Sequence, residues 1–285
     1  MVRTARRRRK PVRSFRRRRV LSTKTIALRD YNETVPCVVS IDQQVGQGGG
    51  FLGKASRFGG HFANKAEAAA QARIRGEQVY AGQTMYIAHS DAPGLRAGVI
   101  FELEGHSRFD GEYLVIAANH SAYRQAPTGF AASGQNGRAY QNTVHCIRSD
   151  VAYRPVPMTP VPQGVGLHTA TVDGEAWNGR PEIDDQGRYR LQFKFADELA
   201  KGAGSGYVRK LEPYVGPNQT GLHCPLVPGT EVVVGYLNGD IDRPVVLGAV
   251  YNPDMRGGIN SDTHLFHRLK TQSGAASEIY DDGPS

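Results

Sequence analysis

The sequence predicts a mainly β protein with one helix, long enough for roughly two domains. Its 285 residues include 34 glycines and 16 prolines, with an apolar share of 39%. This composition is typical of strands joined by turns rather than of a helical bundle. Two stretches, residues 188–195 and 231–251, follow the two-residue period of strands. A single stretch, from Asn64 to about Tyr80, is convincingly helical.

The basic character of the chain lies in its first 19 residues, which hold eleven arginines and lysines and no acid. The remainder carries 24 basic against 27 acidic side chains. Charge repulsion predicts a disordered basic tail over 1–19, although from Ser14 the segment begins to look like a strand. The tail is either an arm that neutralises the phosphates of nucleic acid or a leader without a partner. We favour the second interpretation, because a basic run alone specifies nothing. The arm residues are Arg6, Arg7, Arg8, Arg9, Arg16, Arg17, Arg18 and Arg19.

Cysteine usage and hydropathy exclude several classes of protein. Cys37, Cys146 and Cys224 are odd in number and far apart, which predicts reduced, packed thiols rather than a disulfide framework. No stretch approaches the roughly 20 apolar residues of a membrane helix. The arginine-rich start also lacks the apolar core of a secretory signal.

The first half of the chain predicts a glycine-rich loop, a helix and then strands. The loop, residues 46–60, almost fits a phosphate-binding pattern, but Ala55 stands where a serine or threonine is needed. We therefore expect a flexible loop. Asn64 and Glu67 have the spacing of a capping box, which predicts the start of the helix. Strands are expected near 99–104, 113–118 and 140–147.

The second half begins after Pro155, Pro157, Pro160 and Pro162, which predict a stiff, extended linker. The alternating strand 188–195 follows the turn 184–187. We expect one set of its residues to face inward and the rest to face solvent. The inward set is Tyr189, Leu191, Phe193 and Phe195.

Residues 231–251 predict a hairpin that is apolar on both faces. Val232, Val234 and Tyr236 share one face of its first strand. Asn238-Gly239-Asp240 supplies the turn chemistry. Pro244, which has no N–H to donate, is expected at the start of the second strand. Asp242 and Arg243 are expected to form a local ion pair.

The order strand, Gly-Asp-x-Asp-Arg-Pro, strand resembles the last hairpin of the oligonucleotide/oligosaccharide-binding (OB) barrel in VgrG proteins. These are the spike proteins of type VI secretion, relatives of phage tail hubs and spikes. Segments 26–32, 111–120 and 188–195 resemble other parts of the family. The motif residues are Gly187, Arg188, Phe193, Pro228, Gly229, Glu231, Gly239, Asp240, Asp242, Arg243, Pro244 and Gly248.

The resemblance implies a partial hub β-domain with one helix over 20–154 and a proline-rich linker over 155–164. An OB barrel over 165–255 and the start of a β-helix stalk over 256–285 would follow. Only the middle of a family member is matched, so we expect a chain truncated at both ends.

Catalytic and metal sites are not indicated by the sequence. The close carboxylate pairs, Asp184-Asp185 and Asp240/Asp242, lie in glycine-containing turns where aspartate is favoured for backbone bonding. His264 and His267 have ligand spacing, but two ligands do not close a zinc site. We expect no enzyme activity, no cofactor and no metal.

Two functions of different class remain. The resemblance implies a homotrimeric spike component that contacts tail-tube and baseplate proteins, carries effectors, and leaves the cytoplasm through the injection machine. The alternative is an OB-fold nucleic-acid-binding module with an arginine-rich arm. Residues 165–255 carry 8 basic against 12 acidic side chains and one tryptophan, Trp177. An acidic barrel is a poor phosphate groove, so nucleic acid is not an expected partner.

Overall fold

The computed structural model describes residues 2–3, 11–33, 36–122, 140–175, 180–197 and 200–281. The chain forms two compact units, Met1–Met158 and Thr159–Ser285. The division falls within the segment predicted as a linker. Val156 and Met158 there are 69% and 94% exposed. Each unit has its own buried core, as described below.

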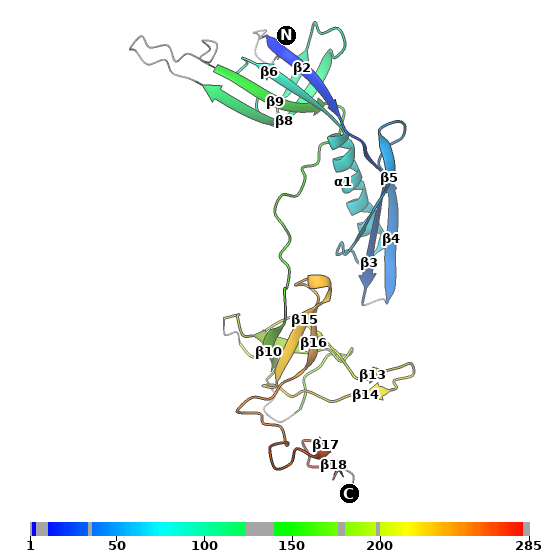
Figure 1. Cartoon of the computed structure of the whole chain (residues 1–285), viewed down its shortest axis with the longest axis vertical. Helices are drawn as coiled ribbons and strands as arrows, with labels where there is room; N and C mark the ends of the chain where they lie inside the picture. Colours follow the sequence, from blue (N-terminus) through cyan, green and yellow to red (C-terminus); the bar gives the residue numbers. More distant parts are fainter. Residues whose placement is uncertain are drawn as a thin grey trace, which may run out of the picture. The chain divides into compact units, whose positions relative to one another are not determined.

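Unit 1 contains a curled six-stranded sheet with the order β1-β7-β8-β9-β6-β2 (Figure 1). All neighbouring strands are antiparallel. A bulge in β8 between Val115 and Ala117 increases the local twist. The strands are β1 (Val2–Arg3), β2 (Val12–Arg19), β6 (Thr84–Ser90), β7 (Ile100–Leu103), β8 (Gly111–Ala122) and β9 (Tyr140–Arg148).

The inner face of this sheet is packed with aromatic rings. Phe15 and Tyr86 each lie 4.9 Å from the ring of Tyr113, edge to face. The Tyr113 hydroxyl donates a hydrogen bond of 2.6 Å to the carbonyl of Phe109. Tyr113 is therefore fully buried with its polar group satisfied, as a buried tyrosine requires.

Strand β2 corrects the prediction of a disordered tail for residues 12–19. Its backbone pairs with β6 from Val12 to Arg19, and Phe15 is only 8% exposed. The arginines from Arg16 onward are all exposed, so the strand forms without burying charge. Residues 4–10, including Arg6–Arg9, lie outside the described part of the chain.

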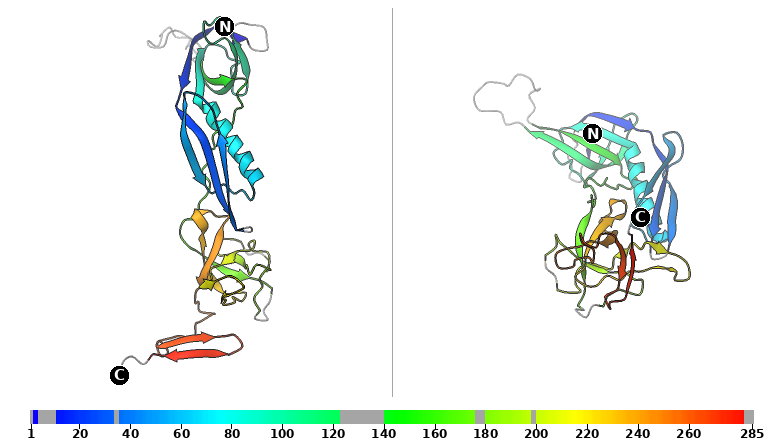
Figure 2. Two further views of the ribbon diagram at one scale, coloured as in Figure 1. Left: turned by 90° about the vertical axis from the view of Figure 1, so that its right-hand side faces the viewer. Right: turned by 60° about the horizontal axis from the view of Figure 1, so that its bottom comes forward.

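The helix and a second sheet form the rest of unit 1. Strands β3 (Ser22–Asn32), β4 (Cys37–Gln44) and β5 (Phe51–Phe58) have the order β4-β3-β5. Helix α1 (Lys65–Gln83) packs on one face of this sheet (Figure 2). Ile26, Leu28, Val39, Phe62, Ala68 and Ala72 are buried between them.

The predicted helix start is confirmed. Asn64 Oδ1 accepts a hydrogen bond of 3.0 Å from the Glu67 N–H, and Glu67 in turn accepts one of 2.8 Å from the Ala63 N–H. The first bond satisfies a backbone donor that the first helical turn leaves free, and the second fixes the residue before the N-cap. The helix continues three residues beyond the predicted Tyr80, to Gln83.

Strand β5 corrects the prediction of a glycine-rich loop over 46–60. Residues Phe51–Phe58 pair in parallel with β3. The ring of Phe51 stacks on that of Tyr80 in α1, with 5.9 Å between centroids. Pairing with a distant strand therefore overrides the weak local propensity of this segment. A strand also cannot form the phosphate-cradling loop considered above.

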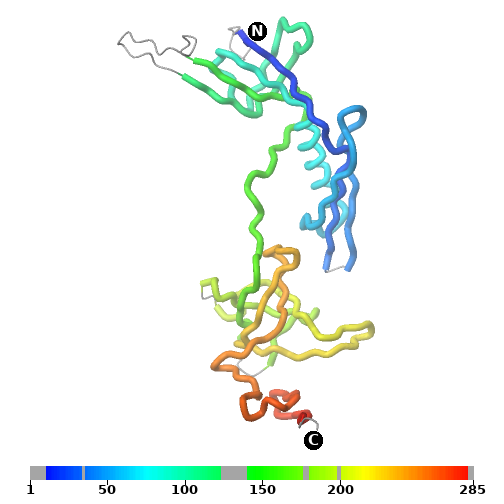
Figure 3. The backbone as a smooth tube through the Cα atoms, in the orientation of Figure 1, coloured from blue at the N-terminus to red at the C-terminus, as the bar shows by residue number. Residues whose placement is uncertain are grey.

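Unit 2 is built on a five-stranded sheet with the order β11-β10-β15-β16-β12. Figure 3 traces the backbone of this unit in the colours that follow residue 159 along the bar. Its two ends are joined where Tyr189 and Val208 exchange backbone hydrogen bonds of 2.9 and 2.7 Å. This exchange closes the sheet into a small barrel and removes its open edges. The strands are β10 (His168–Asp173), β11 (Arg190–Phe193), β12 (Arg209–Lys210), β15 (Glu231–Tyr236) and β16 (Pro244–Ala249).

The barrel interior is apolar and agrees with most of the predicted inward residues. Val232, Val234, Tyr189 and Leu191 are fully buried. The prediction is wrong for Phe195, which is 70% exposed. Strand β11 ends at Phe193, and the chain turns there, so the alternation stops before Phe195.

Unit 2 also contains two short hairpins that are separate from the five-stranded sheet. Strands β13 (Tyr214–Val215) and β14 (Gly221–Leu222) form a short arm. Strands β17 (Phe266–Lys270) and β18 (Ala276–Tyr280) form an antiparallel hairpin (Figure 2) whose residues are exposed except for the half-buried Phe266. This hairpin is not a β-helix, so the stalk stays a prediction. Among the described helices, none has the length and hydropathy needed to span a membrane.

Candidate functional site

The turn between β15 and β16 holds Gly239, Asp240, Asp242 and Arg243 of the motif residues in a defined backbone geometry. Asn238 and Gly239 have φ values of 57° and 73° within the short 3-10 turn η1 (Leu237–Gly239). The Leu237 N–H donates to the Arg243 carbonyl at 3.0 Å, and the Arg243 N–H donates to the Asp240 carbonyl at 2.9 Å. Asparagine and glycine tolerate the left-handed region better than other residues, which explains their place in this turn.

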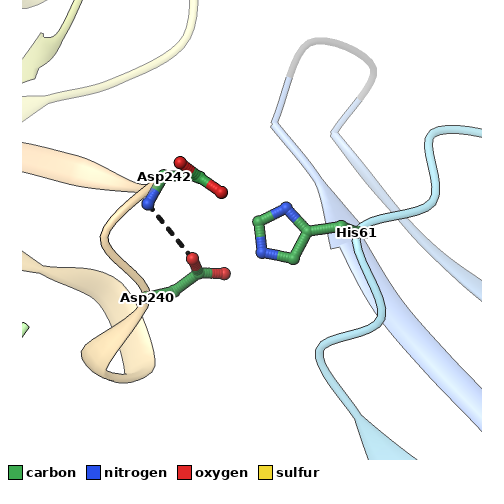
Figure 4. Close-up of side chains that lie close together, drawn as sticks. All are labelled: His61, Asp240 and Asp242. Carbon is green, nitrogen blue, oxygen red and sulfur yellow. Dashed lines mark hydrogen bonds between the residues drawn. The ribbon is translucent and has the colours of Figure 1, made fainter. Parts of the chain in front are cut away.

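The carboxylate of Asp240 stabilises the same turn. Its Oδ1 accepts a hydrogen bond of 3.1 Å from the Asp242 N–H (Figure 4), and its Oδ2 lies 3.7 Å from Nε of Arg243. The predicted pair between Asp242 and Arg243 is therefore wrong. Arg243 reaches back three residues to a half-buried carboxylate, whereas Asp242 is exposed. His61, also labelled in Figure 4, belongs to unit 1.

The lead-in to β15 is fixed by backbone and side-chain bonds. Gly229 has φ 90°, and its N–H donates to the Val172 carbonyl at 2.9 Å. Glu231 accepts a hydrogen bond of 3.0 Å from the Asn252 side chain, which lies just beyond β16. The motif residues at both ends of the hairpin thus join β10, β15 and the segment after β16.

The strand β16 begins at Pro244 as predicted, opposite Tyr236. Gly248 lies opposite Val233, next to a register shift between Val233 and Val234. A bulge of this kind bends a strand and raises its twist, which helps a small barrel to close. Pro228 lies in the lead-in and is half-buried.

The turn before β11 is held by Asp184. Its Oδ1 accepts from the Gln186 and Arg188 N–H groups at 3.0 and 2.9 Å, and its Oδ2 accepts from Arg188 Nε at 2.7 Å. Burial acts to raise the pKa of Asp184, but the bonds from Arg188 outweigh it and lower the pKa. Gly187 takes φ 73° at the end of this turn. Both carboxylate pairs noted in the sequence therefore belong to turns.

The outer surface of the barrel carries an apolar patch centred on Gly235. A Cβ at Gly235 would lie 3.2 Å from Leu247 Cδ1 and 3.7 Å from Leu167 Cδ2, so both leucine side chains lie close to the glycine. Leu167 is 66% exposed and Leu247 41%. We call Leu167, Gly235 and Leu247 the outer patch.

An aromatic cluster on the barrel was missed by the sequence reasoning. Phe193 and Phe195 stack with 5.1 Å between centroids. The ring of His168 lies 5.7 Å from Phe195 and 5.4 Å from Tyr236. These residues come from or follow three different strands, so no local pattern could indicate that they meet.

A charged cluster at the base of the β13–β14 arm was also missed. Lys210 Nζ donates to both carboxylate oxygens of Glu212 at 2.8 and 2.9 Å, and to the Cys224 carbonyl at 2.7 Å. His223 Nδ1 lies 2.6 Å from Glu212 Oε1. Burial acts to raise the pKa of Glu212, but Lys210 and His223 outweigh it and lower the pKa. The cluster ties the two ends of the arm together.

The histidines considered as metal ligands have separate partners. His264 Nδ1 lies 2.7 Å from the Ser261 carbonyl oxygen, and His267 Nε2 lies 4.0 Å from Asp281. Both histidines are exposed.

Comparison with known families matches both units of the chain. Residues 2–126 match the model of the phage tail baseplate hub (GPD). Residues 181–251 match the model of the type VI secretion system/phage-baseplate injector OB domain. The chain belongs to the VgrG family. Its fold is accordingly a partial hub domain followed by an OB barrel.

Named relatives agree with this assignment. The chain is 31% identical over 205 residues to the type VI secretion system spike protein VgrG1b of Pseudomonas aeruginosa, covering 69% of this chain and 26% of the relative. It is 33% identical over 171 residues to VgrG1c of the same organism, covering 57% and 22%. The chain thus spans about a quarter of the length of these VgrG proteins.

A solved structure supports the fold alone. A chain of the Francisella PdpA-VgrG complex, half-lidded, aligns with a TM-score of 0.51 at 8% identity, covering 95% of this chain and 48% of that chain. For the VgrG motif residues, the structure adds a physical role that the family match does not give. They set turns and strand ends around the barrel.

Proposed function

We propose that this chain is a structural spike component of a contractile injection machine and that it works as a homotrimer. The observation that supports this most directly is the outer patch. The barrel core is already filled by Val232, Val234 and Val246, so Leu167 and Leu247 have no place inside it. We expect apolar side chains that remain outside a filled barrel to be buried against a second copy of this chain, because burial removes them from water.

A closed ring is the assembly that this arrangement favours. In a cyclic trimer the outer patch of each barrel would pack against a second surface of the next barrel, so all three patches are buried without leaving a free end. Three barrels around an axis would form the rigid neck of a spike. The turns fixed by Asp184 and Asp240 would keep that neck stiff under load.

The mechanism that follows is mechanical. Contraction of a sheath would drive the spike through a membrane, with effectors carried on it. Tail-tube and baseplate proteins and secreted effectors would be the partners. Assembly would take place in the cytoplasm, and export would use the machine itself. No catalytic step is assigned to this chain in the proposal.

The nucleic-acid alternative has one observation in its favour, the aromatic cluster around Phe195. Base stacking needs such rings, but it works beside a positive groove. Residues 165–255 hold 8 basic against 12 acidic side chains. The charge of the barrel therefore supports the spike function over the alternative.

The test is the solution mass of the purified full chain, measured by light scattering over a wide concentration range. The proposal predicts a species of about three times the 31.0 kDa of one chain. A well-folded monomer at every concentration would contradict self-association through the outer patch. The spike function would then require segments outside this sequence.

A further inference from the structure

Strand β2 is an edge of its sheet. In the described part of the chain it hydrogen-bonds with β6 on one side, and the sheet order ends with β2 on the other (Figure 1). An edge strand presents a row of free N–H and C=O groups that can pair with an added strand. Proteins often protect such edges with charged residues, and β2 has four consecutive arginines there.

Two of these arginines are available for a partner. Arg17 lies over the ring of Phe109, with Cζ 5.7 Å from its centroid, and Arg19 Nη2 donates to the Gly49 carbonyl at 3.3 Å. Arg16 and Arg18 are exposed and make no ion pair or side-chain hydrogen bond with any described residue. Alternation along the strand places these two on the sheet face opposite Phe15.

The acid that lies nearest along the strand is already engaged. Arg13 Nε donates to Asp91 Oδ1 at 2.9 Å, in a two-pronged contact between the two side chains. This pair shows that a carboxylate can lie beside β2 in a well-defined geometry. No equivalent carboxylate faces Arg16 or Arg18 within the described residues.

We propose that β2 is a docking edge for an extended acidic segment of a partner protein, which adds to the sheet as a seventh strand. Its backbone would pair with the free edge of β2. Asp or Glu at alternate positions would lie across from Arg16 and Arg18, where directly opposite charges stabilise a strand pair. The residues between them would face the side of Phe15 and Phe109, which favours apolar side chains.

A peptide strand fits these observations better than nucleic acid does. The free backbone groups of an edge are matched by another strand and leave no role for a phosphate backbone. The arginines of β2 also alternate between two faces of the sheet, and Arg17 is held over Phe109. A phosphate chain would need its cations gathered on one face.

The test uses fluorescence anisotropy with the full chain and an eight-residue peptide, the length of β2, that alternates glutamate and valine. A second peptide has the same sequence with alternate backbone amides methylated, which removes donors but keeps the charge. A single-stranded DNA oligonucleotide of equal charge is the third probe. The variants are Arg16→Glu/Arg18→Glu and a matched control, Arg57→Glu/Lys65→Glu, whose residues are exposed in unit 1 away from β2.

The proposal predicts that the first peptide binds. Methylation of the peptide should weaken binding by at least about tenfold because backbone pairing is lost. The Arg16→Glu/Arg18→Glu change should weaken it by at least about tenfold because charge attraction is lost. The control variant should bind as the native chain does. Equal binding of the methylated peptide would overturn strand addition. Equal loss in the control, or binding of the oligonucleotide alone, would overturn the acidic-strand partner. The midpoint of the titration reports peptide binding and not the oligomeric state of the chain, so this proposal and the trimer can fail separately.

Discussion

Aspartates in both units stabilise the backbone rather than presenting free carboxylates. The buried Asp30 accepts hydrogen bonds from the Gly60 and His61 N–H groups at 3.1 and 2.7 Å. Asp173 accepts one from the Gly204 N–H at 2.9 Å. A carboxylate whose lone pairs are occupied in this way is poorly suited to act as a general base. At the scale of single residues, Asp30 and Asp173 therefore have a structural role.

The three cysteines should differ sharply in reactivity. Cys146 is fully buried, and burial raises its pKa to about 12, whereas Cys37 and Cys224 are exposed. The thiolate is the reactive form, and at pH 8 a group with that pKa is almost entirely protonated. We expect Ellman's reagent to label two thiols in the native chain and the third only after unfolding in guanidinium chloride.

Replacing the buried thiol provides the control for that measurement. Cys146→Ala should leave the native count at two and reduce the count in guanidinium chloride to two. Rapid reaction of three thiols in the native chain would contradict the burial of Cys146. That result would mean that the six-stranded sheet opens within the time of the labelling reaction and exposes Cys146.

At the scale of elements, the sequence predicted those whose signals are local. The β15–β16 hairpin follows from a two-residue period and turn chemistry at Gly239, and α1 follows from the cap at Asn64. Strand β5 was missed because Gly53 and the polar residues around it give no clear period, and only pairing with β3 makes it a strand. The charge of residues 1–19 predicted a disordered tail in which only the segment from Ser14 begins to look like a strand, whereas β2 pairs with β6 from Val12 while its arginines stay exposed.

The clusters at the surface of the barrel could not be predicted from the sequence. His168, Phe195 and Tyr236 come together only when β10 pairs with β15 and β11. Lys210 and His223 meet through Glu212 only when the β13–β14 arm folds back. Such contacts depend on strand order and register, which single-strand patterns do not specify.

Closure of the barrel depends on a close backbone approach at Gly204. A Cβ there would lie 2.3 Å from the Leu191 carbonyl oxygen and 2.8 Å from Asp173 Oδ2. Gly204→Ala must therefore displace β11 or the carboxylate that binds this loop. We expect a loss of about 1–3 kcal/mol in the free energy of unfolding, the usual cost of overpacking, measured by denaturant titration.

Gly206→Ala is the matched control, because a Cβ at that position would have no heavy atom within 4 Å. Its effect should be small or slightly stabilising, since alanine restricts the unfolded chain. Equal stability of the two variants would show that the loop moves away from Leu191 at little cost. The closure between Tyr189 and Val208 would then not depend on this approach.

At the scale of the whole molecule, each unit has the parts that a folded domain needs. Unit 1 has two buried clusters, one inside the six-stranded sheet and one beneath α1. Unit 2 has one, inside the barrel. Self-association can therefore be tested on this chain through substitutions that leave these cores untouched.

The outer patch makes a specific prediction for assembly. The double variant Leu167→Asp/Leu247→Asp should dissociate the proposed trimer, because the apolar burial of two leucines, at most about 1.5–3 kcal/mol each, would be lost and an unpaired carboxylate at the interface adds a desolvation cost. The measurement is the mass by light scattering, with circular dichroism to verify folding. The control is Leu211→Asp/Leu222→Asp, which alters leucines that are 57% and 49% exposed elsewhere in unit 2. A trimer that survives the first variant would place the interface away from Gly235, and a trimer lost in both variants would show that the loss is not specific to the outer patch.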